Sequence, residues 1–369
     1  MFKHEIPNTP VHPEPPPLIE ISGTHLAMGR QIGEAARHQV QNSIANAQVL
    51  INAAYNTLEL TWEGAKLQAR KYLPFAEERY PQYVDEMRGI AEGANVPFDE
   101  VVALNTMEAV TMDALHLTRC TSMAVNNDRT TNGHVLAAHN EDWIPEDESD
   151  VLIISAKPDK EPPFLAMTYG GLLCNVGFNA YGIAQLIDSV YPSDSRIGIP
   201  RLVVARAVLS SHRISGAMGR ALVQHRAAGY NHLLIHESGE IYSIEVSARK
   251  FEILYSYDGI MVHTNHFLDP QMKLVEKDPE ELLSSRVRYF RASRLIRQTE
   301  KHSIESLQAI QKDHVNIPNS ICNHNFSEKD PLDREKTINA LTIDLTAREM
   351  HVAWGNPCRN EYHTYRLNA

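Results

Sequence analysis

Residues 119–143, RCTSMAVNNDRTTNGHVLAAHNEDW, decide the fold that we expect for this chain. CTSMAV (120–125) and HVLAAHNEDW (134–143) have the length and apolar content of strands, and the Asn132-Gly133 dipeptide between them is a strong hairpin-turn signal. The chain before Cys120 has helical spacing, so Cys120 opens a strand directly after a helix-to-strand junction. The segment therefore predicts an antiparallel hairpin that begins with a cysteine.

Groups of helices and strands alternate on both sides of this hairpin. Apolar residues recur at helical spacing from about Met28 to Leu117, in 200–228 and in 279–313. Strand patterns fill 151–187 and 230–267, and two strands, TINALTIDLT (337–346) and EMHVAWGNP (349–357), close the chain. Strand groups bracketed by helix groups predict an α+β fold in which two packed sheets lie between helices, a four-layer αββα sandwich.

We expect a single domain, because no linker divides the 369 residues. The proline-rich residues 1–17 predict an extended lead-in without a core of its own. A helical part at 18–119 and a second part at 120–369 follow, and the boundary between them is a change of pattern within one domain.

Composition excludes several classes of function. The net charge of −11 argues against a nucleic-acid partner or an anionic membrane, because no broad basic face survives it. The four cysteines lie far apart without a CxxC pair, which predicts neither a disulfide framework nor a structural zinc site. The N-terminus lacks the apolar core of a signal peptide, and no apolar run is long enough to span a membrane. We expect a cytoplasmic protein.

Two segments besides Cys120 carry candidate chemistry. On a regular strand, Asn140 and Asp142 of HNEDW share one face, and a polar pair on an otherwise apolar strand must be hydrogen-bonded or solvated. In HTNHF (263–267), Asn265 could donate a side-chain N–H to a developing oxyanion, although an Asn at a strand end is also a common turn residue.

A metal centre is the alternative that the histidines of HTNHF raise. His263 and His266 stand three residues apart, but no carboxylate or third histidine follows at a recognisable ligand spacing, and HExxH is absent. We expect neither a metal nor a cofactor.

Seven blocks in the same order resemble the acyl-coenzyme A:isopenicillin N acyltransferase (6-aminopenicillanic acid acyltransferase) family of self-processing Ntn hydrolases. CTSMAV is similar to the segment that begins at the family's nucleophile, and HNEDW to a segment of Asn, then Asp and an aromatic residue. The other blocks are IEISGTHLAMGRQIGE (19–34), GFNAYGIA (177–184), GIPRLVVARAVL (198–209), HTNHF and GNPCRNEYHTY (355–365). The resemblance covers nearly the whole chain.

This resemblance implies a precursor that cuts itself between Arg119 and Cys120 into two associated chains. Cys120 would then carry an α-amine whose reference pKa of about 7.7–8.0 lets it act as base for its own thiol. Asn265 would supply the oxyanion N–H, Asp142 would orient the amine, and Asn140 would support them. Arg206 matches a recurrent arginine, for which a substrate carboxylate and a structural ion pair both stay open.

The implied substrate is a small N-acyl amino acid or N-acyl amine, hydrolysed through an acyl-thioester on Cys120, with an acyl-coenzyme A donor as a further option. One departure from the family is Arg119, because the members compared have Gly before the nucleophile. An uncleaved binding protein of the same fold is therefore the alternative from another class. A relationship to bile-salt or penicillin V amidases is disfavoured, since those chains begin almost at the cysteine.

Overall fold

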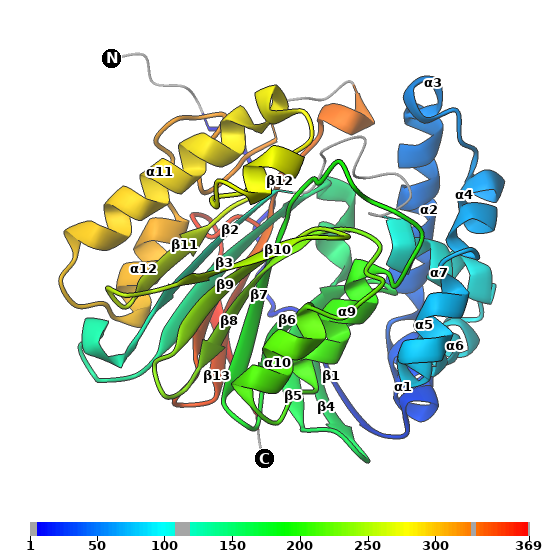
Figure 1. The fold of residues 1–369 in the computed structure, drawn as a ribbon, viewed down its shortest axis with the longest axis horizontal. Coiled ribbons are helices and arrows are strands. Elements are labelled where there is room, and N and C mark those ends of the chain that lie inside the picture. Colours follow the sequence, from blue (N-terminus) through cyan, green and yellow to red (C-terminus); the bar gives the residue numbers. More distant parts are fainter. Residues whose placement is uncertain (1–5, 108–118, 326–329, 368–369) are drawn as a thin grey trace.

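The computed structural model describes residues 6–107, 119–325 and 330–367, whose strands form two sheets (Figure 1). The eight-stranded sheet has the order β1-β4-β5-β6-β7-β8-β9-β10, and the six-stranded sheet has the order β11-β2-β3-β12-β13-β14. Neighbouring strands are antiparallel except β1 and β4, which run parallel. The strand bounds are β1 Leu18–Gly23, β2 Arg119–Val125, β3 Leu136–Trp143, β4 Val151–Pro158, β5 Phe164–Tyr169, β6 Val176–Asn179, β7 Ile183–Ser189, β8 Tyr230–His236, β9 Ile241–Val246, β10 Phe251–Tyr255, β11 Ile260–His263, β12 Lys336–Asp344, β13 Glu349–Trp354 and β14 Tyr362–Arg366.

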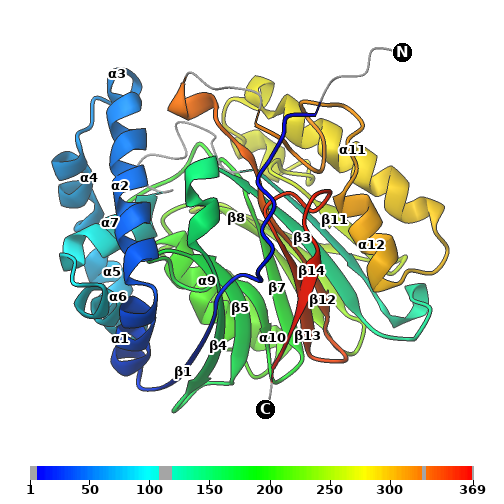
Figure 2. The ribbon, with the colours of Figure 1, turned by 180° about the vertical axis from the view of Figure 1, so that it is seen from behind.

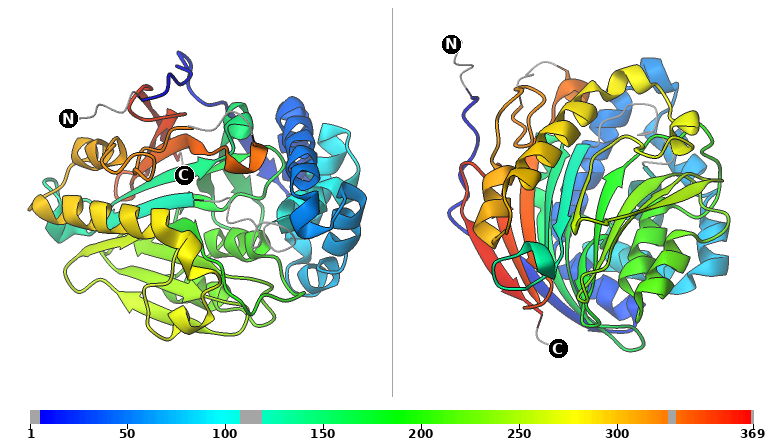
Figure 3. Two further views of the ribbon diagram at one scale, coloured as in Figure 1. Left: turned by 90° about the horizontal axis from the view of Figure 1, so that it is seen from above. Right: turned by 60° about the vertical axis from the view of Figure 1, so that its left-hand side comes forward.

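Helices cover the outer faces of both sheets, which confirms the predicted αββα arrangement (Figures 1 and 3). One apolar cluster joins α11 and α12 to β2, β3 and β11, and another joins α9 and α10 to β7, β8 and β9. The largest cluster fills the space between the sheets and extends to the N-terminal helices at one side. The helix bounds are α1 His25–Ala35, α2 Arg37–Ala53, α3 Tyr55–Leu58, α4 Trp62–Ala69, α5 Leu73–Arg79, α6 Pro81–Ala94, α7 Phe98–Met107, α9 Arg201–Leu209, α10 Ile214–Ala221, α11 Leu283–Gln298 and α12 Ile304–Gln311.

Glycines explain how α1 and α6 pack. A Cβ atom on Gly29 would lie 2.1 Å from the Glu86 carbonyl oxygen, and one on Gly93 would lie 2.3 Å from the Arg30 carbonyl oxygen. Gly33 and Gly89 show the same conflict with backbone atoms of the facing helix. The helix backbones therefore approach as closely as they do only because both carry glycine at a spacing of four residues. The sequence MGRQIGE, which marks the start of the resemblance, is one half of this contact.

Residues 6–17 of the N-terminal lead-in form neither helix nor strand and cross the back of the molecule beside β14 (Figure 2). The His12 ring stacks on Trp354 with centroids 4.3 Å apart, and the Tyr365 hydroxyl donates to the Pro16 carbonyl oxygen over 2.6 Å. The segment thus gains its order from the closing strands.

Two expected boundaries differ from the structure. The part expected to be helical from residue 18 begins with β1, which pairs with β4 at the edge of the eight-stranded sheet. The chain closes with three strands rather than two, because β14 pairs with β13 inside the block GNPCRNEYHTY. Part of the predicted N-terminal helical region, 108–118, lies outside the described residues. Among the described helices, none has the length and apolarity that crossing a membrane requires.

Candidate active site

Cys120 is the second residue of β2, in the predicted hairpin. The register pairs Cys120 with Glu141 and Arg119 with Asp142 of β3. The Arg119–Cys120 peptide bond therefore lies within a regular strand. Cys120 is only 2% exposed, because β11 covers the other edge of β2 and α11 packs on its outer face.

Asn265 and Arg288 hold the backbone on both sides of the Cys120 α-carbon. The Cys120 backbone N–H donates to Asn265 Oδ1 over 2.7 Å, and Arg288 Nη1 donates to the Cys120 carbonyl oxygen. Arg288 Nη2 also donates to Asn265 Oδ1 over 2.9 Å, which fixes the amide orientation of Asn265. The Asn265 amide nitrogen donates to the Ser189 carbonyl oxygen over 3.0 Å. In the uncleaved chain Asn265 thus meets Cys120 through its oxygen, whereas the sequence predicted a role for its N–H.

Asp142 lies beside the same backbone. Thr337 donates to Asp142 Oδ1 over 2.6 Å, whereas Oδ2 is buried and lacks a hydrogen-bond partner among the described residues. Burial raises the pKa of Asp142 to about 7, against the opposing effects of Arg288 and Thr337. This oxygen can therefore accept a further hydrogen bond.

The Cys120 thiol faces the space between the sheets, where it meets carboxylates. Its Sγ lies 3.8 Å from Glu141 Oε2, which in turn lies 2.9 Å from His139 Nε2. Ser122 connects the His139 ring to Asp188 of the facing sheet over 3.0 and 2.8 Å. Burial, followed by the charges of Glu141 and Asp188, raises the pKa of the Cys120 thiol well above its usual value. The thiol is therefore protonated at neutral pH in the uncleaved chain and needs a base.

Arg119, the departure from the family pattern, has a defined position. Its guanidinium pairs with Glu335, just before β12, and Glu335 also accepts from Asn323 over 2.7 Å. Arg119 is the first residue of β2 and pairs with Asp142 of β3 in the regular register of the sheet. The bulky side chain is accommodated without disturbing the strand.

Asn140 and Arg206 lie outside the immediate surroundings of Cys120. Asn140 Nδ2 donates to the carbonyl oxygens of Gln311 and Ile321, so it anchors the chain that follows α12. Arg206 of α9 is fully buried and donates to both Glu86 oxygens over 3.1 Å. Its guanidinium also lies 4.5 Å from the Phe164 ring centroid. The geometry favours the ion-pair role over the substrate role for Arg206.

We expect replacement of Arg206 to reduce stability without a specific effect on substrate binding. In a Cys120→Ala background, which we expect to stay one chain, Arg206→Met should lower the free energy of unfolding by about 3 kcal/mol, because the buried Glu86 carboxylate then keeps His25 alone of its two charged partners. Denaturant unfolding measures this, and the added Glu86→Gln change should restore part of the loss. A stable Arg206→Lys enzyme with a raised KM alone would instead support a substrate role.

A pocket opens beside Cys120, between the N-terminal helices and the two sheets. Cys120 and Glu141 line it together with Asp147 and apolar side chains from several elements. The apolar lining residues include Leu50, Leu104, Val176, Ile187 and Leu202. Because residues before and after position 119 both contribute, the pocket requires both parts of the chain. Its apolar walls fit an acyl group, and Glu141 is the polar lining residue that contacts the thiol in the described structure.

The metal reading of HTNHF finds no support in the described geometry. His263 lies between Glu245 and Asp188, at 2.8 and 3.5 Å. Burial alone would lower the pKa of His263, but these two carboxylates raise it to about 9. Within the described chain, Cys120, His139 and Glu141 are close enough to hold a metal, although the His139–Glu141 hydrogen bond already accounts for their approach.

The sequence reasoning missed Arg288 and Glu141. Arg288 lies on the buried face of α11 with Ser284, Ala292 and Ile296, each four residues from the next. A charged residue within such an apolar series was the signal that could have found it, because a buried cation requires partners. Glu141 pairs across the hairpin with Cys120, a consequence of the register that the sequence alone did not fix.

Two sheets packed between helices, with a buried cysteine as the second residue of a central strand, match the architecture expected of an amidohydrolase or acyltransferase of the Ntn type. The family model "Acyl-coenzyme A:6-aminopenicillanic acid acyl-transferase" matches residues 129–359. The chain belongs to this family. The matched range includes Asp142, Asn265 and Arg288 and begins after Cys120.

Two curated proteins and one solved structure are similar to this chain. The chain is 25% identical over 343 residues to the "Acyl-coenzyme A:6-aminopenicillanic-acid-acyltransferase 40 kDa form" of Emericella nidulans, with 92% of each chain covered. It is 26% identical over 221 residues to "Beta-alanyl-dopamine/carcinine hydrolase" of Drosophila melanogaster, covering 54% of this chain and 56% of that protein. The structure of penicillin V acylase from Agrobacterium tumefaciens is 17% identical, with a TM-score of 0.43 and coverage of 64% of this chain and 83% of that one.

Proposed function

We propose that the protein is a precursor that cuts its own Arg119–Cys120 bond and then hydrolyses small N-acyl amino acids or N-acyl amines through a thioester on Cys120. The observation that carries the proposal is a pair of contacts on the Cys120 backbone, whose N–H donates to Asn265 and whose carbonyl oxygen accepts from Arg288. Two side chains from distant parts of the sequence converge on a single residue that carries a nucleophile. That arrangement holds a reacting group in place.

Self-cleavage would proceed by a shift of the acyl group from nitrogen to sulfur. Cys120 Sγ attacks the Arg119 carbonyl carbon, the thiol proton passes to the departing amide nitrogen, and the peptide bond is replaced by a thioester. Glu141 Oε2, 3.8 Å from Sγ, is placed to accept the proton first. Water then cleaves the thioester and leaves a carboxylate on Arg119 and a free thiol on Cys120. The Glu335 ion pair keeps the Arg119 side chain fixed during the shift.

The freed α-amine of Cys120 would become the base for substrate. Its nitrogen already donates to Asn265 Oδ1, and we expect a second amine hydrogen to be donated to Oδ2 of Asp142, which pairs with the adjacent Arg119 across the strands. With a reference pKa of about 7.7–8.0, the amine can take the thiol proton and return it to the leaving amine of the substrate. The acyl group is then carried on Sγ until water removes it. In this state the second Asn265 amide hydrogen is the donor proposed for the oxyanion.

The apolar walls of the pocket indicate an aliphatic acyl group. For mature enzyme and a series of N-acyl glycines and N-acyl amines from acetyl to octanoyl, we expect kcat/KM to rise about fourfold for each added methylene until the pocket is full, since each buried CH₂ contributes about 0.8 kcal/mol. Release of free amine measures the rate. Leu172→Phe, which narrows the pocket, should shift the optimum to shorter chains.

A flat response to chain length would contradict this assignment of the pocket. Transfer is tested in the same series by supplying acyl-coenzyme A with a free amine acceptor, because one relative is named as an acyltransferase. A wild-type protein that stays uncleaved and turns over none of these amides would favour the alternative, a binding protein of the same fold.

A further inference from the structure

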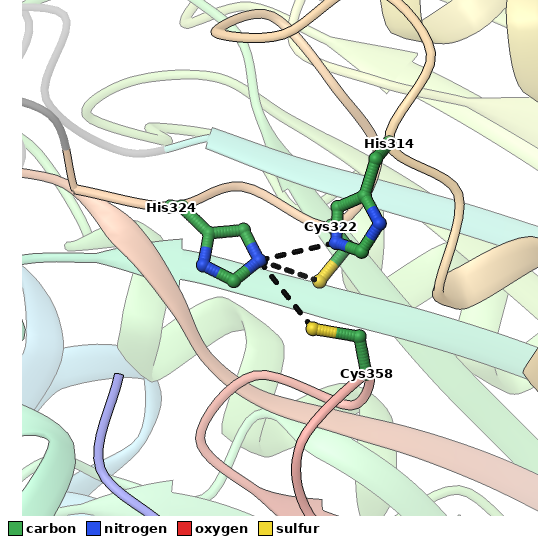
Figure 4. A group of neighbouring side chains, drawn as sticks. All are labelled: His314, Cys322, His324 and Cys358. Carbon is green, nitrogen blue, oxygen red and sulfur yellow. Dashed lines mark hydrogen bonds between the residues drawn. The ribbon is translucent and has the colours of Figure 1, made fainter. Parts of the chain in front are cut away.

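Four potential metal ligands from three segments converge at a second place, outside the pocket (Figure 4). His314 follows α12, Cys322 and His324 lie in the segment that leads to β12, and Cys358 lies between β13 and β14. One nitrogen or sulfur atom from each residue lies within 4.8 Å of the other three. Cys322 and His324 are buried, and the other two residues are partly exposed. The sequence reasoning discarded a zinc site on cysteine spacing alone, which cannot reveal ligands brought together by the fold.

The distances from His324 Nε2 to the other three potential ligand atoms fit tetrahedral coordination of one ion. His324 Nε2 lies 3.1 Å from His314 Nε2, 3.6 Å from Cys322 Sγ and 3.4 Å from Cys358 Sγ. Zinc bonds of about 2.0–2.1 Å to nitrogen and about 2.3 Å to sulfur give tetrahedral edges of about 3.3 Å between two nitrogens and about 3.6 Å between nitrogen and sulfur. The three observed edges agree with these values to within about 0.2 Å.

Hydrogen bonds alone do not account for this convergence. An imidazole nitrogen is either a donor with one hydrogen or an acceptor with one lone pair, so His324 Nε2 cannot satisfy three partners at once. A shared cation at the centre satisfies all four groups together. Asn356 adds an N–H that lies 3.5 Å from Cys322 Sγ, the kind of outer contact that supports a thiolate ligand.

We propose that His314, Cys322, His324 and Cys358 bind one zinc ion in a closed structural site. Two thiolates and two imidazoles in tetrahedral geometry are a zinc donor set, and four protein ligands leave no position open for a substrate or water. The ion would fasten the α12–β12 connection to the β13–β14 turn. It would thereby act as a staple between segments that are separate in the sequence.

Hydrogen bonds connect the proposed zinc site to the surroundings of the Arg119–Cys120 bond. Asn323, between two of the ligands, donates to Glu335, the partner of Arg119. Its backbone N–H also donates to Thr337 Oγ1, which holds Asp142. If the proposed self-cleavage takes place, loss of the ion should slow it. Metal content tests the site independently of that function.

The decisive measurement is the metal content of the full-length chain, purified without a histidine tag and analysed by elemental mass spectrometry. We expect about one zinc ion per chain in wild type and in Cys174→Ser, the matched control for a buried cysteine outside the cluster. Cys322→Ser and Cys358→Ser should each contain much less zinc than wild type. Should these variants not fold, the wild-type value and His314→Gln, at a partly exposed ligand, decide the question.

Spectroscopy and stability provide the second readout. Zinc removed by a chelator under reducing conditions should lower the thermal midpoint, and added Zn²⁺ should restore it. Co²⁺ in its place should give the absorption of a tetrahedral thiolate complex. Wild type that neither contains nor binds zinc would overturn the proposal. A Cys322–Cys358 disulfide in place of the ion, detected by intact mass, would also overturn it. Iron in place of zinc would overturn the identity of the ion.

Discussion

Cys120→Ala should be recovered as one intact chain of 369 residues, whereas wild type should be recovered as two chains, 1–119 and 120–369. The variant lacks the only atom at that position that can attack the Arg119 carbonyl, because the hydroxyls of Thr121 and Ser122 follow later peptide bonds. Alanine fits the buried site, because it only removes the thiol. The variant should therefore fold, stay uncleaved and hydrolyse no N-acyl substrate, a complete loss on both counts.

Denaturing gels and intact mass spectrometry read out cleavage, and amine release reads out activity. Cys174→Ala is the matched control, since Cys174 is also buried and lies outside both the pocket and the metal cluster. It should be cleaved and active like wild type. A cut between residues 119 and 120 in purified Cys120→Ala would show that another protease acts there. An uncleaved but active wild type would show that the amine is not the base.

The sequence predicted the features of the fold that depend on local pattern. The β2–β3 hairpin follows from two apolar strands around Asn132-Gly133, and the register then places Asp142 opposite Arg119. Asn265 was already a candidate from HTNHF, to which the resemblance gave a role, and the fold brings its Oδ1 to 2.7 Å from the backbone nitrogen of Cys120, 145 positions earlier.

The features that escaped prediction depend on tertiary packing. Arg288 is an unremarkable arginine in a helix rich in arginine until α11 packs against β2 and buries it. The metal cluster combines His314 and Cys358, which are 44 positions apart, because β12 and β13 bring their flanking loops together. Arg206 was found in the sequence, but its role was not. The contact with Glu86, which only the fold reveals, favours an ion pair over a substrate contact.

Arg288→Lys should slow self-cleavage about 100-fold or more while the protein still folds. Arg288 donates to the Cys120 carbonyl oxygen, Thr121 Oγ1 and Asn265 Oδ1 from one planar group. A lysine keeps the positive charge beside the buried Asp142. The single ammonium group of lysine, however, cannot reach three acceptors in that geometry. Cys120 and Asn265 would then shift relative to each other, and a displacement of about 1 Å at a reacting centre can cost about 10² in rate.

Arg291→Lys provides the matched control within the same helix. Arg291 also makes a two-pronged contact, with Asp313 over 3.0 and 2.6 Å, but it lies three residues away from Arg288 and contacts neither Cys120 nor Asn265. Both variants lose the fork of a guanidinium, but Arg288 is buried and Arg291 is partly exposed, so the thermal midpoint should fall less in Arg291→Lys. Only Arg288→Lys should accumulate precursor in a time course after synthesis, and its cleaved fraction should show a lowered kcat with a smaller change in KM. Equal cleavage rates in the two variants would reduce Arg288 to a buried stabilising cation, and the contact with the Cys120 carbonyl would then have no part in the reaction.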